Sequence, residues 1–303
     1  MAEPLVPEGR MRRVLLEAAI SAAAAPSVYN AQPWRLLLRP DRLEVHADPG
    51  QMVYRADPVG RQLHISCGCA VFNAVIAVAA QGAAPQVCTL PRPDRPRLLA
   101  AIAPAPAGEA DPIGALREWV PRRQTPREPL EAEQVDAATA RLLRRAARAE
   151  GAVLDAVGAE TRAAVADLHD RAVRSEPQLG SNELPRAPSG AGSAAQHSGL
   201  FVLSTPGDDR ASWLAAGRAL ERVLLELTAR GMTAVPMMQA IECVPVRAEL
   251  ADLLPGQRFP QLLLRVGRAP QRPPVHRRRL VDVLVHGAEW DSGSVQDRAA
   301  TGC

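Results

Sequence analysis

The sequence predicts an α+β fold, in which helices and strands are mixed without the regular alternation of a doubly wound sheet. Two short apolar runs, 34–38 and 43–47, flank a Pro-Asp pair, as in a hairpin. Residues 63–82 form a long apolar stretch that ends at a glycine, which is typical of a buried helix. Residues 208–231 have a helical stripe, an aspartate to cap its start and a glycine to end it.

The elements of the first part follow in chain order. Residues 11–24 predict a helix, because Val14, Leu15, Ala18 and Ala19 share one face. The hairpin and the apolar helix come next, and the last elements expected are a strand at 86–90 and a Pro- and Ala-rich connection at 91–112.

The second part begins beyond this connection. Its expected elements are helices at 131–150, 159–175 and 208–231, and buried strands at 200–205 and 260–267. Residues 177–199 predict a long loop that could serve as a lid. The chain is thus expected to divide into a first half, 1–110, a second half, 111–287, and a loose tail, 288–303.

The composition excludes several classes of function. The sequence has no lysine, so all 36 basic residues are arginine, and a P-loop lysine or a lysine Schiff base is excluded. A net charge of +3, spread along the chain, does not predict nucleic-acid binding. No uninterrupted apolar run is long enough to predict a membrane span, and the start of the chain does not resemble a signal peptide. Five unpatterned cysteines fit a reducing cytoplasm.

The segment 25–35, here called the joint, has the sequence APSVYNAQPWR. Ser27, Asn30 and Gln32 offer groups that both donate and accept hydrogen bonds, as the edge of a fused heteroaromatic ring requires. The prolines, among them Pro33, would fix the backbone. The alternative is a rigid entry to the hairpin, anchored by a buried Trp34.

Two arginine clusters and one methionine-rich segment are further candidates. Arg122, Arg123 and Arg127 lie in RRQTPR, and Arg277, Arg278 and Arg279 lie in HRRR. Paired guanidinium groups suit a phosphate dianion, although a solvated surface explains either cluster alone. The segment GMTAVPMMQAIE could pack Met238 and Gln239 beside a planar ligand, or it could simply fill the core. His64, Cys67 and Cys69 lack a second ligand pair, so no metal site is expected.

These segments, in this order, resemble the Acg-type branch of the FMN-dependent nitroreductase-like proteins. The resemblance runs from about residue 12 to 285 and is most specific in APSVYNAQPWR, DPVGRQLHISCGCAVFNAVIA, RRQTPREPL, STPGDDRASWLAAGRALERVLLE and FPQLLLRVGRAPQRPPVHRRRLVDVL. Tyr29 departs from it, since histidine is common there, as do Gln124-Thr125, Leu130 and Met238-Gln239-Ala240.

The resemblance implies a nitroreductase-like α+β fold in which the usual intertwined dimer is fused into one chain, either a monomer with an internal pseudo-dimer or a weak homodimer. It implies FMN as cofactor, with Arg122, Arg123 and, close behind, Arg127 on the phosphate. Ser27, Asn30, Gln32, Pro33 and Trp34 would face the ring, Arg278 and Arg279 would add a second phosphate grip, and Met238 and Gln239 would run beside the flavin.

The expected function is that of an FMN-binding oxidoreductase which passes hydride or electrons through flavin N5 in alternate half-reactions. A small-molecule substrate and, by the resemblance, NAD(P)H are the expected partners, and no catalytic residue is assigned. The alternatives are a protein that sequesters FMN beneath a closed lid with little or no turnover, and a relative that has lost the cofactor.

Overall fold

The computed structural model describes residues 8–52, 57–106, 111–126, 130–131, 135–175, 199–271 and 275–285. Its longer helices are α1 (Glu8–Ala23), α2 (Arg61–Ala80), α3 (Ala137–Ala149), α4 (Ala159–Ser175), α6 (Arg210–Thr228) and α8 (Val244–Asp252). The short helical turns are η1 (Val28–Asn30), η2 (Pro49–Gln51), η3 (Pro112–Trp119), α7 (Gln239–Glu242) and α9 (Leu280–Val283). The strands are β1 (Trp34–Leu38), β2 (Leu43–Ala47), β3 (Ala83–Thr89), β4 (Leu98–Pro106), β5 (Val153–Ala156), β6 (Gly199–Thr205), β7 (Thr233–Pro236), β8 (Phe259–Gly267) and β9 (Leu284–Val285).

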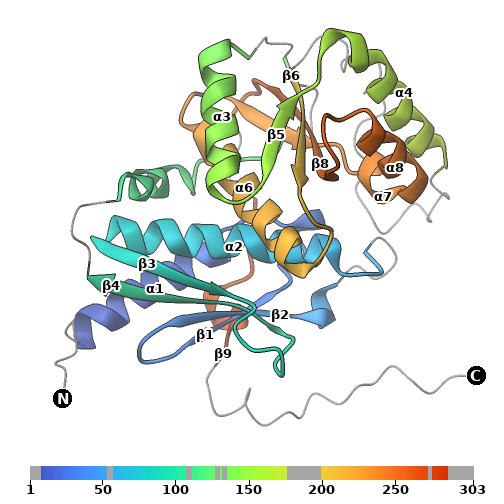
Figure 1. Cartoon of the computed structure of the whole chain (residues 1–303). Helices are drawn as coiled ribbons and strands as arrows, with labels where there is room; N and C mark the ends of the chain where they lie inside the picture. The colour runs from blue at the N-terminus through green and yellow to red at the C-terminus, as the bar shows by residue number, and fades with distance from the viewer. Residues whose placement is uncertain are drawn as a thin grey trace, which may run out of the picture.

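The α+β prediction is confirmed. In the described part of the chain, one five-stranded sheet has the order β3-β4-β2-β1-β9 and one four-stranded sheet has the order β5-β6-β8-β7. The predicted hairpin is β1 and β2, which pair antiparallel from Trp34–Ala47 to Leu38–Leu43. The two sheets lie in separate parts of the molecule, with α2 and α6 between them (Figure 1).

The connection expected at 91–112 contains a strand that the sequence analysis missed. β4 pairs with β2 through Leu98–Ile102 and with β3 through Ala100–Pro106. Leu99 and Ile102 are fully buried, so this strand belongs to the core. Its prolines, Pro104 and Pro106, lie beyond the part that pairs with β2 and face β3 alone, which is why a proline-rich run can still form a strand here.

Helices α2 and α6 cross at two glycines. A Cβ atom on Gly217 would stand 1.9 Å from the carbonyl oxygen of Ile65, and one on Gly68 would stand 2.3 Å from that of Leu214. The two helix backbones therefore touch, which only glycine permits. By length and composition α2 could cross a membrane, but 94% of that stretch is buried inside the protein, as expected of a core helix.

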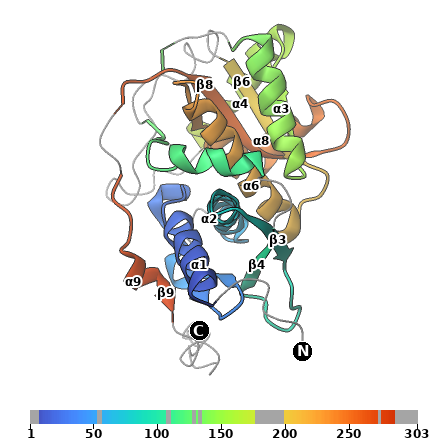
Figure 2. The same ribbon diagram turned by 90° about the vertical axis from the view of Figure 1, so that its left-hand side faces the viewer.

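The end of the described chain returns to the first sheet. Beyond β8, the chain runs down one side of the molecule to α9 and β9, which lie near α1 (Figure 2). β9 pairs parallel with β1, Leu284 opposite Leu36. A segment assigned by sequence to the second half thus completes a sheet of the first half, and the division at 110/111 remains a prediction.

The remaining expectations differ in detail. The helix expected at 131–150 begins only at Ala137, because the carboxylate of Asp136 accepts hydrogen bonds from the backbone N–H groups of Ala138 and Thr139 and caps it there. The strands β5 and β7 were not predicted. Each has four residues, which are too few for a recognisable alternation of apolar and polar side chains. Residues 177–198 of the expected loop, and the tail 288–303, lie outside the described residues.

Candidate functional site

The joint has an unusual backbone. Ser27 precedes the turn η1, and Tyr29, Asn30 and Gln32 have φ angles of 52°, 59° and 50°. Such left-handed residues other than glycine are uncommon and strained, and strain of this kind concentrates at functional sites. Two hydrogen bonds stabilise the conformation: Ser27 Oγ accepts from the backbone N–H of Gln32 at 2.9 Å, and Gln32 Nε2 donates to the carbonyl of Asn30 at 3.1 Å.

The structure brings the joint together with the second arginine cluster, some 250 residues later. Gln32 Oε1 accepts from the backbone N–H of Arg278 at 2.7 Å. Asn30 Oδ1 accepts from Arg277 Nη1 at 2.8 Å, and Asn30 Nδ2 donates to the carbonyl of His276 at 3.0 Å. Two of the five side chains predicted to face a ring, those of Asn30 and Gln32, therefore hold the C-terminal segment in place.

Pro33 and Trp34 connect the joint to β1 and α2. Trp34 is fully buried, and the carbonyl of Pro33 accepts from the thiol of Cys67 at 3.2 Å and from the backbone N–H of Asp48 at 3.1 Å. Their positions fit the alternative interpretation, a rigid entry to the hairpin. A direct contact of either with a ring remains a prediction.

One residue of each arginine cluster, Arg123 and Arg277, acts electrostatically on the same carboxyl group, that of Glu221. Arg123 is buried, and its Nε lies 3.5 Å from a carboxylate oxygen of Glu221 on α6. Burial, and then repulsion from Arg123, lowers the pKa of Arg277 to about 10. Burial raises the pKa of Glu221 to about 7, against the attraction of Arg123 and Arg277. Two guanidinium groups, one buried and one half-buried, thus act electrostatically on one buried carboxyl group.

The other arginines of the clusters are placed differently. Arg122 is exposed, and its guanidinium carbon lies 5.1 Å from the centre of the Trp119 ring. Arg278 donates to the carbonyls of Gln32 and Asp282, while Arg279 is exposed and paired with the Asp282 carboxylate at 3.1 Å. Arg277 and Arg278 are thus half-buried, and Arg277 is the one whose charge acts on Arg123 and Glu221. Three consecutive arginines in the sequence give no signal as to which of them has this role.

Two further predictions concern Arg127 and the pair Met238 and Gln239. Arg127 lies outside the described residues. Met238 and Gln239 stand at the start of α7, where half-buried Met238 packs against the main core. Their place beside a ring remains a prediction.

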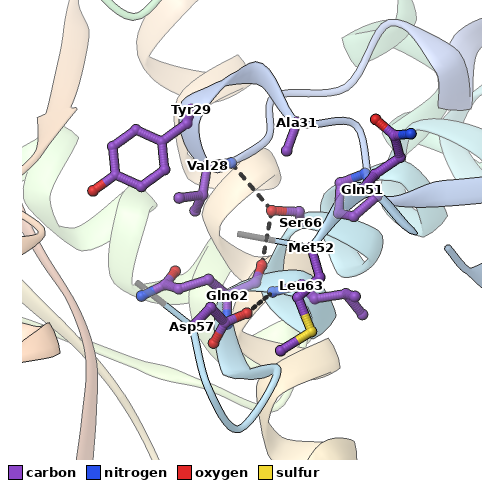
Figure 3. A pocket seen from close by; sticks show the side chains of 10 residues that line it. Val28, Tyr29, Ala31, Gln51, Met52, Asp57, Gln62, Leu63 and Ser66 are labelled. Atoms are coloured by element: carbon purple, nitrogen blue, oxygen red, sulfur yellow. Dashed lines mark hydrogen bonds between the residues drawn. The ribbon is translucent and has the colours of Figure 1, made fainter. Parts of the chain in front are cut away.

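A pocket lies between the joint and the first turns of α2 (Figure 3). Its walls come from the joint, from the segment around η2 and from α2, namely Val28, Tyr29, Ala31, Pro33, Gln51, Met52, Asp57, Gln62, Leu63 and Ser66. Asp57 caps α2 by accepting from the backbone N–H groups of Gln62 and Leu63 at 3.0 and 2.8 Å. Ser66 Oγ donates to the backbone carbonyl of Gln62 at 2.8 Å and accepts from the backbone N–H of Val28 at 3.2 Å. The sequence analysis did not predict this pocket.

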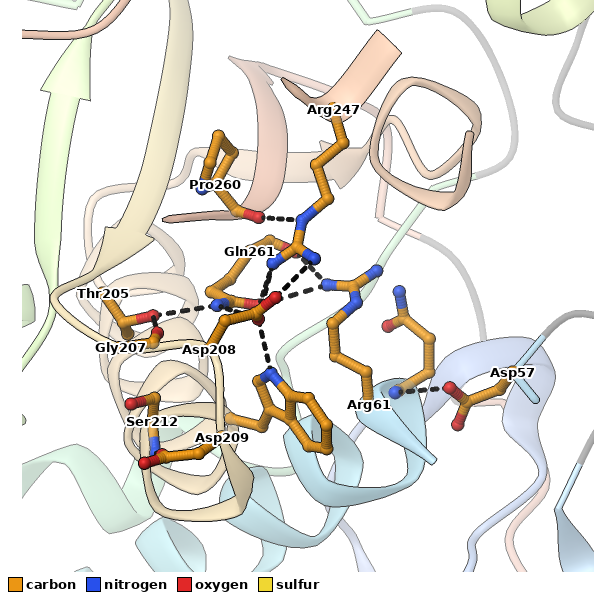
Figure 4. Close-up of polar contacts among 12 residues, drawn as sticks. Asp57, Arg61, Thr205, Gly207, Asp208, Asp209, Ser212, Arg247, Pro260 and Gln261 are labelled. Atoms are coloured by element: carbon orange, nitrogen blue, oxygen red, sulfur yellow. Dashed lines mark hydrogen bonds and ion pairs between the residues drawn. The ribbon is translucent and has the colours of Figure 1, made fainter. Parts of the chain in front are cut away.

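A polar network stands at the start of α6 (Figure 4). Arg247 holds the Asp208 carboxylate in a bidentate pair, at 2.7 and 2.9 Å, and Trp213 Nε1 donates to the same carboxylate at 2.7 Å. Partial burial by itself raises the pKa of Asp208, but the hydrogen bonds from Arg247 and Trp213 outweigh it and lower the pKa to about 2. Arg61, at the start of α2, joins the network through Gln261, whose carbonyl accepts at 2.8 Å.

We expect Asp208→Asn to destabilise the protein in a pH-dependent way. Because the folded pKa of Asp208 lies below its unfolded value, the wild-type carboxylate stabilises the fold above about pH 4 and loses this effect as the pH falls towards 2. The variant should lose about 1–3 kcal/mol of unfolding free energy at pH 7. Urea unfolding at several pH values measures this: a gap between the two proteins that stays constant from pH 7 to pH 2 would contradict the assignment.

No metal centre is formed in the part of the chain that the structure describes, where no three His, Cys, Asp or Glu side chains stand together. Cys67 and Cys69 point to different neighbours. The Cys67 thiol contacts the joint through Pro33, and the Cys69 thiol donates to the carbonyl of Gly217 on α6.

Comparison with known proteins gives the family. No family model matches the chain. A protein of Mycobacterium tuberculosis strain H37Rv is named "Putative NAD(P)H nitroreductase Rv3131". It is 32% identical over an alignment of 318 positions, gaps included, that covers 91% of this chain and 91% of the relative. The chain belongs to the Acg-type nitroreductase family. The family member that gives this branch its name, "Putative NAD(P)H nitroreductase acg" of the same strain, is 28% identical and covers 90% of this chain and 95% of its own.

Solved structures add a more distant likeness. A nitroreductase of Desulfovibrio desulfuricans, in complex with FMN, has a TM-score of 0.41 and 17% identity over 58% of this chain. An NADPH:FMN oxidoreductase of Vibrio harveyi, complexed with NAD+, has a TM-score of 0.39 and 14% identity over 54% of this chain. At these values the family assignment rests on the Mycobacterium relatives alone.

The candidate site of this Acg-type nitroreductase is built from distant parts of the sequence. The joint and α2 come from the first part of the chain, whereas Arg123, Glu221 and Arg277 come from the second. The candidate site therefore combines segments that lie far apart in the sequence.

Proposed function

We propose that the protein is an FMN-binding oxidoreductase of the nitroreductase type that takes electrons from NAD(P)H. Its relative Rv3131, which is 32% identical over 91% of the chain, is named as an NAD(P)H nitroreductase. The observation that carries the proposal is the placement of two arginines, buried Arg123 and half-buried Arg277, beside a strained joint that also lines a pocket.

The arginine pair fits a phosphate group. Arg123 and Arg277 repel one another, and one carboxyl group, Glu221, compensates at most one of their two charges. A phosphate dianion would remove this repulsion and would accept charge-assisted hydrogen bonds from both guanidinium groups. Because the chain has no lysine, arginine must supply the permanently charged side chains of such a site.

The joint fits the support of a planar ring. Asn30 and Gln32 fix the C-terminal segment, and the prolines and the buried Trp34 hold the backbone, so the residues between them are preorganised. When bound, FMN supplies the redox chemistry, because its N5 accepts a hydride and its ring passes the electrons on. The protein's own tasks are to orient the ring, to hold the phosphate and to limit access of water.

The fold also supports an internal pseudo-dimer. The backbones of α2 and α6 touch at Gly68 and Gly217, and β9 completes the sheet of the first part. We propose that these contacts replace the subunit interface of a two-chain nitroreductase, and that the cofactor lies at the junction. In this arrangement the chain needs no second copy to complete its site. The cysteines, free in the described part of the chain, fit a cytoplasmic protein.

The first experiment is to add FMN to the purified protein, dialyse it and record its visible spectrum. We expect retained yellow flavin that NADH or NADPH bleaches rapidly in the absence of oxygen. Protein that stays colourless would refute cofactor binding. Flavin that is retained but that neither donor bleaches would favour the sequestering function instead.

A further inference from the structure

The function proposed above assigns no role to one of the side chains that line the pocket. Gln62, in the first turn of α2, is only 2% exposed. Among the described residues, neither its Oε1 nor its Nε2 has a hydrogen-bond partner. A buried amide with both groups unpaired is costly and calls for an explanation.

The surroundings of Gln62 restrict what could bind to it. Most of the ten described residues that line the pocket are apolar or aromatic, and none of them is basic. Their one carboxylate, on Asp57, already caps the start of α2. The Gln62 side chain and the Tyr29 ring project to the same side of the pocket (Figure 3). A neutral, flat group therefore fits better than a phosphate or a carboxylate.

We propose that Gln62 binds the carboxamide of the dihydronicotinamide electron donor. A primary carboxamide carries one carbonyl and one NH₂ group, so it can accept from Gln62 Nε2 and donate to Gln62 Oε1. The two hydrogen bonds would satisfy both unpaired atoms at once, and apolar walls suit the faces of a pyridine ring. This inference rests on the proposed function, because it identifies the donor site of that same reaction.

The electron acceptors match Gln62 less well. A nitro group or a quinone carbonyl offers acceptor oxygens alone, so it could satisfy Nε2 but would leave Oε1 unpaired. Gln62 is therefore expected to select the donor, and to have little effect on the choice of acceptor.

The test compares FMN-loaded wild type with Gln62→Leu, using stopped-flow reduction of the flavin in the absence of oxygen. Two donors are used: NADH, and reduced 3-acetylpyridine adenine dinucleotide, which keeps the carbonyl and lacks the NH₂ group. In the wild type NADH should react with the higher kcat/KM. In Gln62→Leu, kcat/KM for NADH should fall roughly tenfold or more, with a smaller loss for the analogue. The matched control is Gln81→Leu at the exposed end of the same helix, which should behave as wild type.

Two further readouts do not depend on turnover. Titration of the oxidised, FMN-loaded proteins with NAD⁺, followed by calorimetry, should show weaker binding in Gln62→Leu. Because the variant removes an unpaired buried amide, its melting temperature without ligands should equal or exceed that of the wild type.

The outcomes separate the two proposals. Equal loss for both donors, or unchanged NAD⁺ binding, would overturn the role of Gln62. So would loss of FMN from Gln62→Leu, since that would assign the amide to the cofactor. A wild type that neither retains FMN nor is reduced by a donor would overturn the proposed function, and the role of Gln62 with it.

Discussion

Replacing Gly217 by alanine should destabilise the protein by about 3 kcal/mol or more, the largest stability effect that we expect from one methyl group. The added Cβ would lie 1.9 Å from the carbonyl oxygen of Ile65 and 2.9 Å from the Cα of Gly68, far inside van der Waals contact. Both obstacles are backbone atoms of α2, so no side-chain rotation can relieve the overlap. The helices must separate, and the core between them must open.

Urea unfolding followed by circular dichroism measures this effect. Gly68→Ala should behave alike, since its Cβ would meet the carbonyl of Leu214. The matched control is Gly9→Ala in the first turn of α1, where a Cβ meets no atom within 4 Å and alanine should be neutral or stabilising by up to about 1 kcal/mol. A Gly217→Ala variant as stable as this control would show that the helices do not cross as described.

Replacing Arg277 by glutamine should weaken FMN binding about 10- to 100-fold, corresponding to roughly 1.5–3 kcal/mol for a lost charge-assisted hydrogen bond. Arg277 has two roles in the proposed site. Its charge acts on the buried Arg123–Glu221 pair, and its guanidinium also holds the joint through Asn30 and the carbonyl of Ala25. Loss of this side chain therefore weakens both the proposed phosphate site and the support of the ring.

Titration of the apoprotein with FMN measures the affinity. Arg122→Gln is the matched control, because Arg122 belongs to the first cluster but is exposed over Trp119 and should contribute little. Arg123→Gln should weaken binding as Arg277→Gln does. Equal affinities for wild type and Arg277→Gln, or a larger loss in Arg122→Gln, would refute the assignment of the phosphate site.

The sequence predicted those parts of the fold that local pattern determines. The hairpin 34–38/43–47 and the helix 159–175 are confirmed with their predicted boundaries, since a turn and a helical period lie within a few residues. β4 was missed, because its prolines mask a strand that two neighbouring strands stabilise. β9 was missed for a similar reason: a run of two residues has no pattern of its own until β1 lies beside it.

For the candidate site, the sequence by itself determined which kinds of group are available: arginine as the sole side-chain cation besides histidine, a joint of prolines and amides, and a family resemblance that the Mycobacterium relatives confirm. Only the tertiary structure decided which of these groups are buried together. It left Arg277 half-buried, with its charge acting on Arg123, and Arg279 exposed, and it left the Gln62 amide unpaired in a pocket. The reason is physical: burial and the pairing of polar groups depend on neighbours from distant parts of the chain, and no local spacing in the sequence specifies them.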